Sequence, residues 1–157
     1  MTNFVNPKTI QNQPLRSFMS YSPNLLKNLG IKLAMEFARE KRPAEIRLFQ
    51  AILLQAFEDS LSMSGFKRET YWKEDSHKWF LENSRDFQDI CWNADMDPEM
   101  VREEYIKLID NGKIKFTELQ RSWINYREFY KLYRNAKSKE ERAEIKKKVF
   151  SEKIRIR

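Results

Sequence analysis

The chain has 157 residues, 41% of them hydrophobic and 34% charged, which is typical of one globular domain and excludes a disordered, low-complexity protein. Three glycines are too few for a turn-rich β architecture or a glycine-rich phosphate loop, and the single cysteine excludes an internal disulfide and fits a reducing compartment. The formal charge of +7 is uneven: residues 73–104 carry 4 Lys/Arg against 10 Asp/Glu, whereas residues 105–157 carry 16 against 7.

The N-terminal residues show no export signal, and no apolar run is long enough to span a bilayer. We therefore expect a cytoplasmic protein without a membrane partner, in the host cytoplasm if the chain is phage-encoded. Residues 1–21 mix Asn, Gln, Pro and Ser without periodicity and are predicted to form a flexible arm. Ser22 and Pro23 then predict the start of a helix to about Lys41, although Gly30 weakens it.

A break at Arg42 and Pro43 precedes the strongest helical pattern, residues 44–63. Its apolar positions recur every three or four residues, at Ile46, Phe49, Ile52, Leu53, Ala56, Phe57 and Leu61. Residues 66–73 are expected to be irregular. A short helix over about 74–83 is expected to bury Trp79, Phe80 or Leu81, and it is followed by helices at about 85–93 and 97–110.

Residues 85–102 read RDFQDICWNADMDPEMVR and carry the most specific pattern in the chain. The first helix would pack Phe87 and Ile90 inward and place the small Cys91 where two helices cross. Residues 94–96 would form the turn. Two short helices that cross steeply need a small residue at the crossing and a kinked turn between them.

The second helix of this unit begins with a strong start signal. Asp97 is placed to cap it, Pro98 occupies the first helical position, and Val101 is expected to be buried. The pattern resembles the helix-turn-helix superfamily, and the wider order of elements looks like small proteins of bacteriophages and alphaproteobacteria. The resemblance implies that the second helix projects outward, where it can enter a major groove.

Two residues depart from the superfamily pattern without breaking it. Asp95 replaces the turn glycine, but Asp tolerates the left-handed conformation better than most residues. Glu104 stands where an apolar residue is expected, and its neighbour Tyr105 is able to take that role.

The charge of the second helix is the larger departure. Glu99, Glu103 and Glu104 accompany only two cations, Arg102 and Lys107, which are the predicted groove contacts. Phosphates repel carboxylates, so base reading by this helix and docking of its acidic face on a protein partner both remain open.

Thr117 to Gln120 form a capping box that opens a helix to about Ala136. Its stripe of Leu119, Trp123, Tyr126, Tyr130 and Tyr133 is more typical of a core or a dimer seam than of a base-stacking surface. The flanking cations are predicted phosphate contacts, namely Arg121, Arg127, Lys131 and Arg134.

Ser138 opens a second capping box and a last, basic helix. Its predicted phosphate contacts are Lys146, Lys147, Lys148, Arg155 and Arg157. A solvated Lys/Glu helix remains the alternative for this segment.

No catalytic or metal site assembles in the sequence. One histidine, His77, and one cysteine, Cys91, do not suffice for a His/Cys zinc site, and no cofactor motif is present. His77 is expected at the surface or the edge of the core, and Cys91 in the core. We expect no enzyme activity, no metal and no cofactor.

The predicted fold is all-α, a compact bundle of about six helices. A helical domain over 22–136 would contain the helix-turn-helix-like unit at 85–110, and 137–157 would form the basic C-terminal helix. The expected function is DNA binding in the regulation of transcription, with double-stranded DNA as partner. The alternatives are an adaptor that modulates a nucleic-acid machine such as RNA polymerase, and a helical virion or DNA-packaging component; a homo-oligomer stays open.

Overall fold

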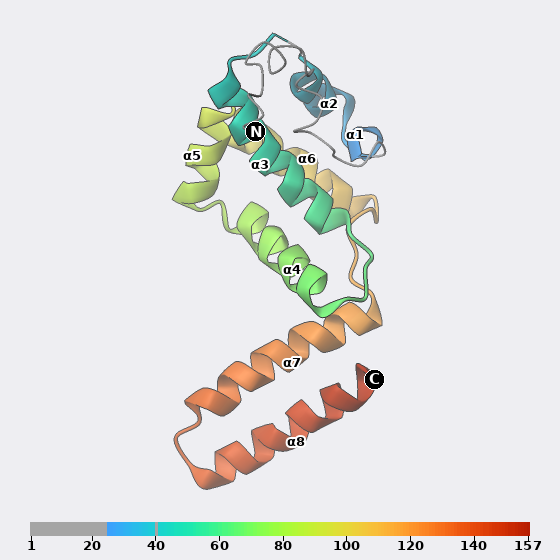
Figure 1. Ribbon diagram of the computed structural model, residues 1–157, viewed down its shortest axis with the longest axis vertical. Helices are drawn as coiled ribbons and strands as arrows, with labels where there is room; N and C mark the ends of the chain where they lie inside the picture. Colours follow the sequence, from blue (N-terminus) through green and yellow to red (C-terminus); the bar gives the residue numbers. More distant parts are fainter. Residues whose placement is uncertain (1–24, 40) are drawn as a thin grey trace, which may run out of the picture.

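The computed structural model describes residues 25–39 and 41–157, and all regular elements in these ranges are α-helices (Figure 1). Eight helices occur there: α1 (Leu25–Asn28), α2 (Ile31–Ala38), α3 (Ala44–Leu61), α4 (Lys67–Glu82), α5 (Arg85–Asn93), α6 (Pro98–Asp110), α7 (Glu118–Asn135) and α8 (Lys139–Arg155). The all-α prediction is confirmed, whereas the expected count of about six is not. The predicted arm at 1–21 and the helix start at Ser22 lie outside the described residues.

Gly30 divides the first predicted helix into α1 and α2. The carboxylate of Glu104, on α6, occupies the space that a Cβ at position 30 would need. This carboxylate lies beside the N-terminus of α2, where the helix dipole favours negative charge. Glycine therefore lets the start of α2 approach α6.

The prediction of irregular structure over 66–73 is wrong, because these residues form the first two turns of α4. The Thr70 hydroxyl donates to the Phe66 carbonyl oxygen at 2.9 Å. The buried face of this half of the helix is polar, since Thr70 and Lys73 are fully buried. A search for apolar periodicity does not detect such a face.

Helices α3 to α6 surround an aromatic core. Phe57, Phe80, Phe87 and Tyr105 are all fully buried, and the rings of Phe80 and Tyr105 stack with centroids 4.0 Å apart. Of the three candidates on α4, Phe80 is the buried one, while Leu81 is 37% exposed. Truncating a ring of this kind to Ala typically costs about 3–5 kcal/mol.

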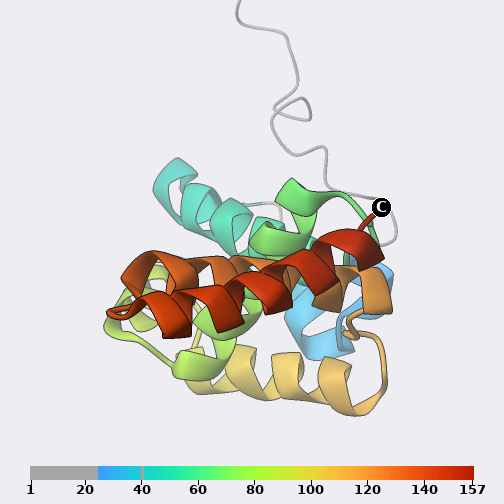
Figure 2. The same cartoon turned by 90° about the horizontal axis from the view of Figure 1, so that it is seen from below.

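Helices α7 and α8 form an antiparallel hairpin that packs on the rest of the molecule through α4 (Figures 1 and 2). From here on, 'the arm' means this C-terminal hairpin, residues 117–157, and not the N-terminal segment 1–21. The predicted capping box at Thr117 is present in both directions. At Ser138 only half is present: Ser138 accepts from the Glu141 backbone N–H at 3.0 Å, but the Glu141 carboxylate accepts from Lys137 N instead. Ile145 and Glu152 face α7 and are buried.

Among the described helices, none combines the length and the apolarity needed to cross a lipid bilayer.

Candidate nucleic-acid interface

The turn between α5 and α6 has the local geometry expected from the sequence. Cys91 and Val101 are fully buried on its two sides. Asp95 has φ +56°, so the prediction that this residue takes the left-handed conformation of the turn is confirmed. Asp97 caps α6 by accepting from the Glu99 backbone N–H at 3.0 Å.

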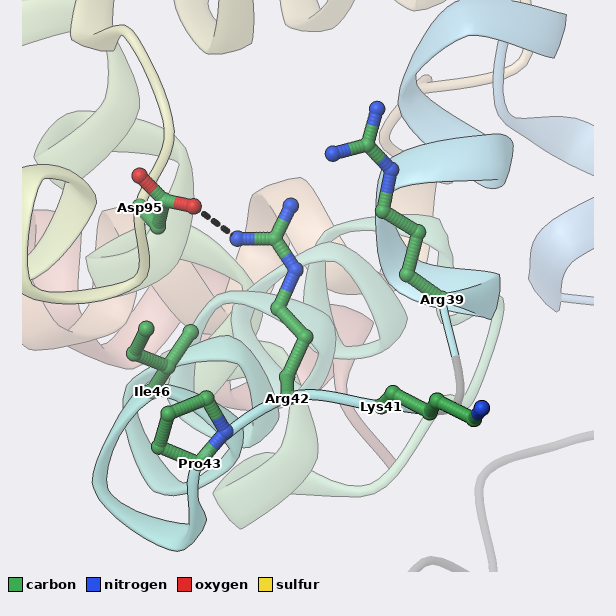
Figure 3. Close-up of a pocket in the computed structure, with 6 residues that line it drawn as sticks. All are labelled: Arg39, Lys41, Arg42, Pro43, Ile46 and Asp95. Atoms are coloured by element: carbon green, nitrogen blue, oxygen red, sulfur yellow. Dashed lines mark hydrogen bonds and ion pairs between the residues drawn. The ribbon is translucent and has the colours of Figure 1, made fainter.

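Two residues that the sequence analysis did not identify fix this turn to the neighbouring helices. We call the described residues before 117 the body. Figure 3 shows the Arg42 guanidinium pointing at Asp95, with which it forms an ion pair. Gln50 donates to the Ala94 carbonyl oxygen at 3.2 Å and is buried. A sequence signal existed for Gln50, because it lies on the apolar face of α3 between Ile46 and Leu53.

The pocket beside this turn has a volume of about 630 Å³ and is lined by three cations, Arg39, Lys41 and Arg42 (Figure 3). Arg42 is 7% exposed and binds Glu36 at 2.7 Å in addition to Asp95. Arg39 binds the same Glu36 at 3.2 Å. Since both arginines are paired with carboxylates, they hold the α2–α3 connection to the α5–α6 turn and are poor ligands for an added anion.

The solvent-facing side of α6 is acidic. Its exposed positions are Glu99, Glu103, Lys107 and Asp110. Lys107, a predicted groove contact, binds Glu104 at 2.7 Å. This surface therefore opposes a close approach of DNA phosphates.

Arg102, the other predicted groove contact on α6, lies against the end of α4. Its Nη2 atom donates weakly to the Leu81 carbonyl oxygen at 3.4 Å, and its Nε atom is buried without a hydrogen-bond partner. The side chain is thus half-buried and does not extend from the helix as a reader of bases does.

Arg127, a predicted phosphate contact, instead holds the arm to the body. Its guanidinium pairs with Glu74 and, at 2.9 Å, with Asp75, and it stacks over the Tyr71 ring at 4.3 Å. The side chain is 18% exposed. Its charge is therefore compensated by carboxylates of α4, although its Nε atom is buried without a hydrogen-bond partner.

The aromatic stripe of α7 lies largely in the contact between α4 and α7, which we call the α4–α7 joint. Trp123 donates to the Gly65 carbonyl oxygen at 3.1 Å and meets Tyr71 edge to face. Tyr126 continues the row and is partly buried, whereas Tyr130 is 45% exposed. The packing interpretation of this stripe is the one that the contacts support.

A buried polar pair, Lys73 and Gln120, completes the joint. Lys73 donates to the carbonyl oxygens of Ser62 at 2.6 Å and Lys115 at 2.7 Å, and to Gln120 Oε1 at 3.3 Å. Gln120 also donates to Ser62 and to Ser64. Burial lowers the pKa of Lys73 to about 8. The start of α7 is therefore tied to both loops beneath it.

The formal excess charge of the chain lies entirely in the arm. Residues 117–157 contain 13 Lys/Arg and 6 Asp/Glu, a net of +7, whereas the other 116 residues contain 17 of each sign. Within the arm, nine exposed cations have no ion pair to any described residue: Arg121, Arg134, Lys137, Lys139, Arg142, Lys146, Lys147, Lys153 and Arg157. Lys131 pairs with Glu128 at 3.0 Å, and Lys148 lies 4.0 Å from Glu144.

Three of the predicted phosphate contacts converge on one groove. Arg121, near the start of α7, and Arg155 and Arg157, at the end of α8, line an open depression of about 1050 Å³. Arg155 binds Glu152 at 3.3 Å, while Arg121 and Arg157 make no ion pair with the described part of the chain. Glu118 is the one carboxylate in the lining, and the N-terminus of α7 adds the positive end of a helix dipole. We call this depression the arginine groove.

In comparisons with protein-family models, curated proteins and solved structures, nothing matches this chain. The function is therefore argued from the geometry of the molecule.

The groups that could serve covalent chemistry are held in structural contacts. Cys91 is fully buried, and burial followed by the charge of Asp97 raises the pKa of its thiol to about 12. His77 lies at the edge of the core, as expected, with Nδ1 2.8 Å from the Tyr105 hydroxyl. Within 25–39 and 41–157, no three His, Cys, Asp or Glu side chains are grouped to hold a metal ion.

Proposed function

We propose that this protein binds double-stranded DNA through its phosphates, with the arm as the binding element. The observation that carries the proposal is the arginine groove, in which cations of two helices meet beside a helix N-terminus. Guanidinium groups form paired, charge-assisted hydrogen bonds with phosphate oxygens, and a helix N-terminus favours the same anion. The uncompensated cations elsewhere on the arm extend the attraction along the duplex.

The molecule is better suited to contacts with the phosphate backbone of DNA than to recognition of the bases. The exposed side of α6 carries three carboxylates and one paired lysine. Binding of single strands uses exposed aromatic rings on which the bases stack, but the rings of α7 are mostly packed in the α4–α7 joint. Binding is therefore expected to depend little on sequence, as in an architectural DNA-binding protein.

We assign α5, its turn and α6 to a helix-turn-helix-like unit that serves here as the rigid body behind the arm. The left-handed Asp95 and the buried Cys91 and Val101 support that assignment. A role in regulating transcription would follow from DNA occupancy by the arm rather than from a recognition helix.

The proposal is tested by fluorescence anisotropy with a labelled duplex of arbitrary sequence at low salt. A double variant, Arg121→Ala with Arg157→Ala, is expected to weaken binding on the order of tenfold for each arginine, since a hydrogen bond to a charged group contributes about 1.5 kcal/mol. The matched control is Lys32→Ala with Lys113→Ala, which removes two exposed cations outside the arm.

The control variant and Arg102→Ala should bind like the wild type. Equal affinities for the arm variant and the matched control would contradict the proposal.

A further inference from the structure

An open apolar groove lies between α3, α4 and α5, with a volume of about 620 Å³. Its floor includes Leu48 and Ile52, one turn apart on α3, together with Trp79 and Ile90. Leu48 is 62% exposed and Ile52 is 40% exposed. Adjacent large apolar side chains exposed to water mark a binding surface, because covering them lowers the free energy.

The rim of this groove is acidic. Asp59, Asp75 and Asp86 line it, and no Lys or Arg does. Asp59 accepts from Gln55 at 2.9 Å and Asp86 accepts from Trp79 at 2.8 Å, so both are bonded to neutral donors. Burial raises the pKa of Asp59, the hydrogen bond from Gln55 partly offsets that rise, and the charges of Glu58 and Glu69 add to it. The rim therefore favours a cationic occupant.

The outward face of α8 has the complementary chemistry. Ile145 and Glu152 face α7, and Phe150 and Ile154 lie on the opposite side of the helix, one turn apart. Phe150 is 64% exposed and Ile154 is 59% exposed. Lys147 and Lys153 flank this pair, are exposed, and form no ion pair with the described residues.

We propose that the groove of one copy binds α8 of a second copy. Phe150 and Ile154 would cover Leu48 and Ile52, and Lys147 and Lys153 would pair with the rim carboxylates. Two apolar anchors four residues apart, set between cations, are the usual way in which an amphipathic helix enters an acidic apolar groove. Within one chain the contact is blocked, because α7 lies between α8 and the body (Figure 1).

The contact joins two different surfaces, and it closes into a two-fold dimer with an isologous interface if each copy inserts α8 into the groove of the other. It uses the side of α8 that faces away from α7, so Arg121, which lies on α7 in the arginine groove, takes no part in it. Self-association therefore leaves Arg121 available to DNA, but it shares Lys147 and Lys153 with the proposed DNA-binding surface.

The experiment is sedimentation velocity of the full chain at low ionic strength, without DNA. The wild type is expected to sediment above the 19.1 kDa monomer, and added salt is expected to shift it toward the monomer because the rim pairs are screened. Phe150→Ser with Ile154→Ser keeps every charge and should be monomeric. These two side chains are largely exposed, so this variant is expected to fold.

Charge reversal then identifies the two surfaces. The groove variant Asp59→Lys with Asp86→Lys, and the helix variant Lys147→Glu with Lys153→Glu, should each be monomeric. Mixed in equal amounts, they should associate again, because each reversed surface now faces its complement. Asp75 is left unchanged since it binds Arg127.

The matched control, Lys32→Glu with Lys113→Glu, changes net charge as the helix variant does and should still associate. A monomeric wild type at low salt, or a mixture that stays monomeric, would overturn the proposal. The Phe150→Ser with Ile154→Ser variant retains every cation and adds none, so its DNA affinity tests the proposed function separately.

Discussion

At the scale of single residues, the polar side chains inside this protein define how its parts join. Gln50, Lys73 and Gln120 are buried, and each bonds a backbone carbonyl of another segment. A buried carbonyl without a partner costs roughly 1–3 kcal/mol, so such residues are needed where loops enter the interior. Apolar periodicity predicts the faces that surround them but not their partners, because those partners are distant in sequence.

Lys73→Met tests the role of the buried ammonium group. The variant keeps the shape of the side chain but leaves the Lys115 carbonyl oxygen without its donor. We expect the free energy of unfolding in urea to fall by about 1–3 kcal/mol. Lys113→Met, at an exposed lysine without an ion pair to any described residue, is the matched control and should change it by less than about 1 kcal/mol. Equal effects of the two substitutions would show that the bonds of Lys73 contribute nothing.

His77 makes stability depend on pH in the weakly acidic range. Burial, followed by the charge of Lys73, lowers its pKa below the ordinary 6.5. Below about pH 6.5 the unfolded chain therefore binds the proton more readily than the folded chain does, and the free energy of unfolding falls as pH drops from about 6.5 to the lower folded pKa. The loss between pH 7 and pH 5 should be smaller in His77→Gln than in the wild type. Parallel pH profiles of the two proteins would contradict this assignment.

At the scale of elements, the sequence predicts helices well where the start signals are local. Thr117, Asp97 and Ser138 each cap the helix that follows them. The first turns of α4 were missed because their stability comes from contacts of Thr70 and Lys73 with other segments. The sequence indicates Gly30 as a weak point within one helix, whereas in the fold this glycine permits a close approach of α2 to α6.

The α5–α6 turn depends on Asp95 for two separate reasons. Its left-handed backbone favours Asp, Asn or Gly, and its carboxylate pairs with the nearly buried Arg42. Asp95→Asn keeps the first property and part of the second, while Asp95→Ala loses both. We expect thermal unfolding to place Asp95→Ala about 1–2 kcal/mol below the wild type and Asp95→Asn between them. Wild-type stability in both variants would show that neither property matters at this turn.

At the scale of the whole molecule, the separation of charge is the feature that most constrains function. The basic C-terminal third was evident from the sequence, and so was the list of candidate cations. The sequence did not indicate which cations lack an ion pair. Arg127, for example, pairs with two carboxylates on a helix about fifty residues earlier in the chain. The meeting of Arg121 with Arg155 and Arg157 likewise depends on the hairpin between α7 and α8, which only the fold reveals.

The most direct measurement is the salt dependence of DNA binding by the wild type and by the Arg121→Ala, Arg157→Ala variant. Each phosphate neutralised by a cation contributes about 0.9 to the slope of log affinity against log salt. The arm variant is therefore expected to bind with a slope shallower by about 2 on duplexes of any sequence. An unchanged slope, or affinity that varies strongly with sequence and is lost in Arg102→Ala, would contradict phosphate binding by the arm.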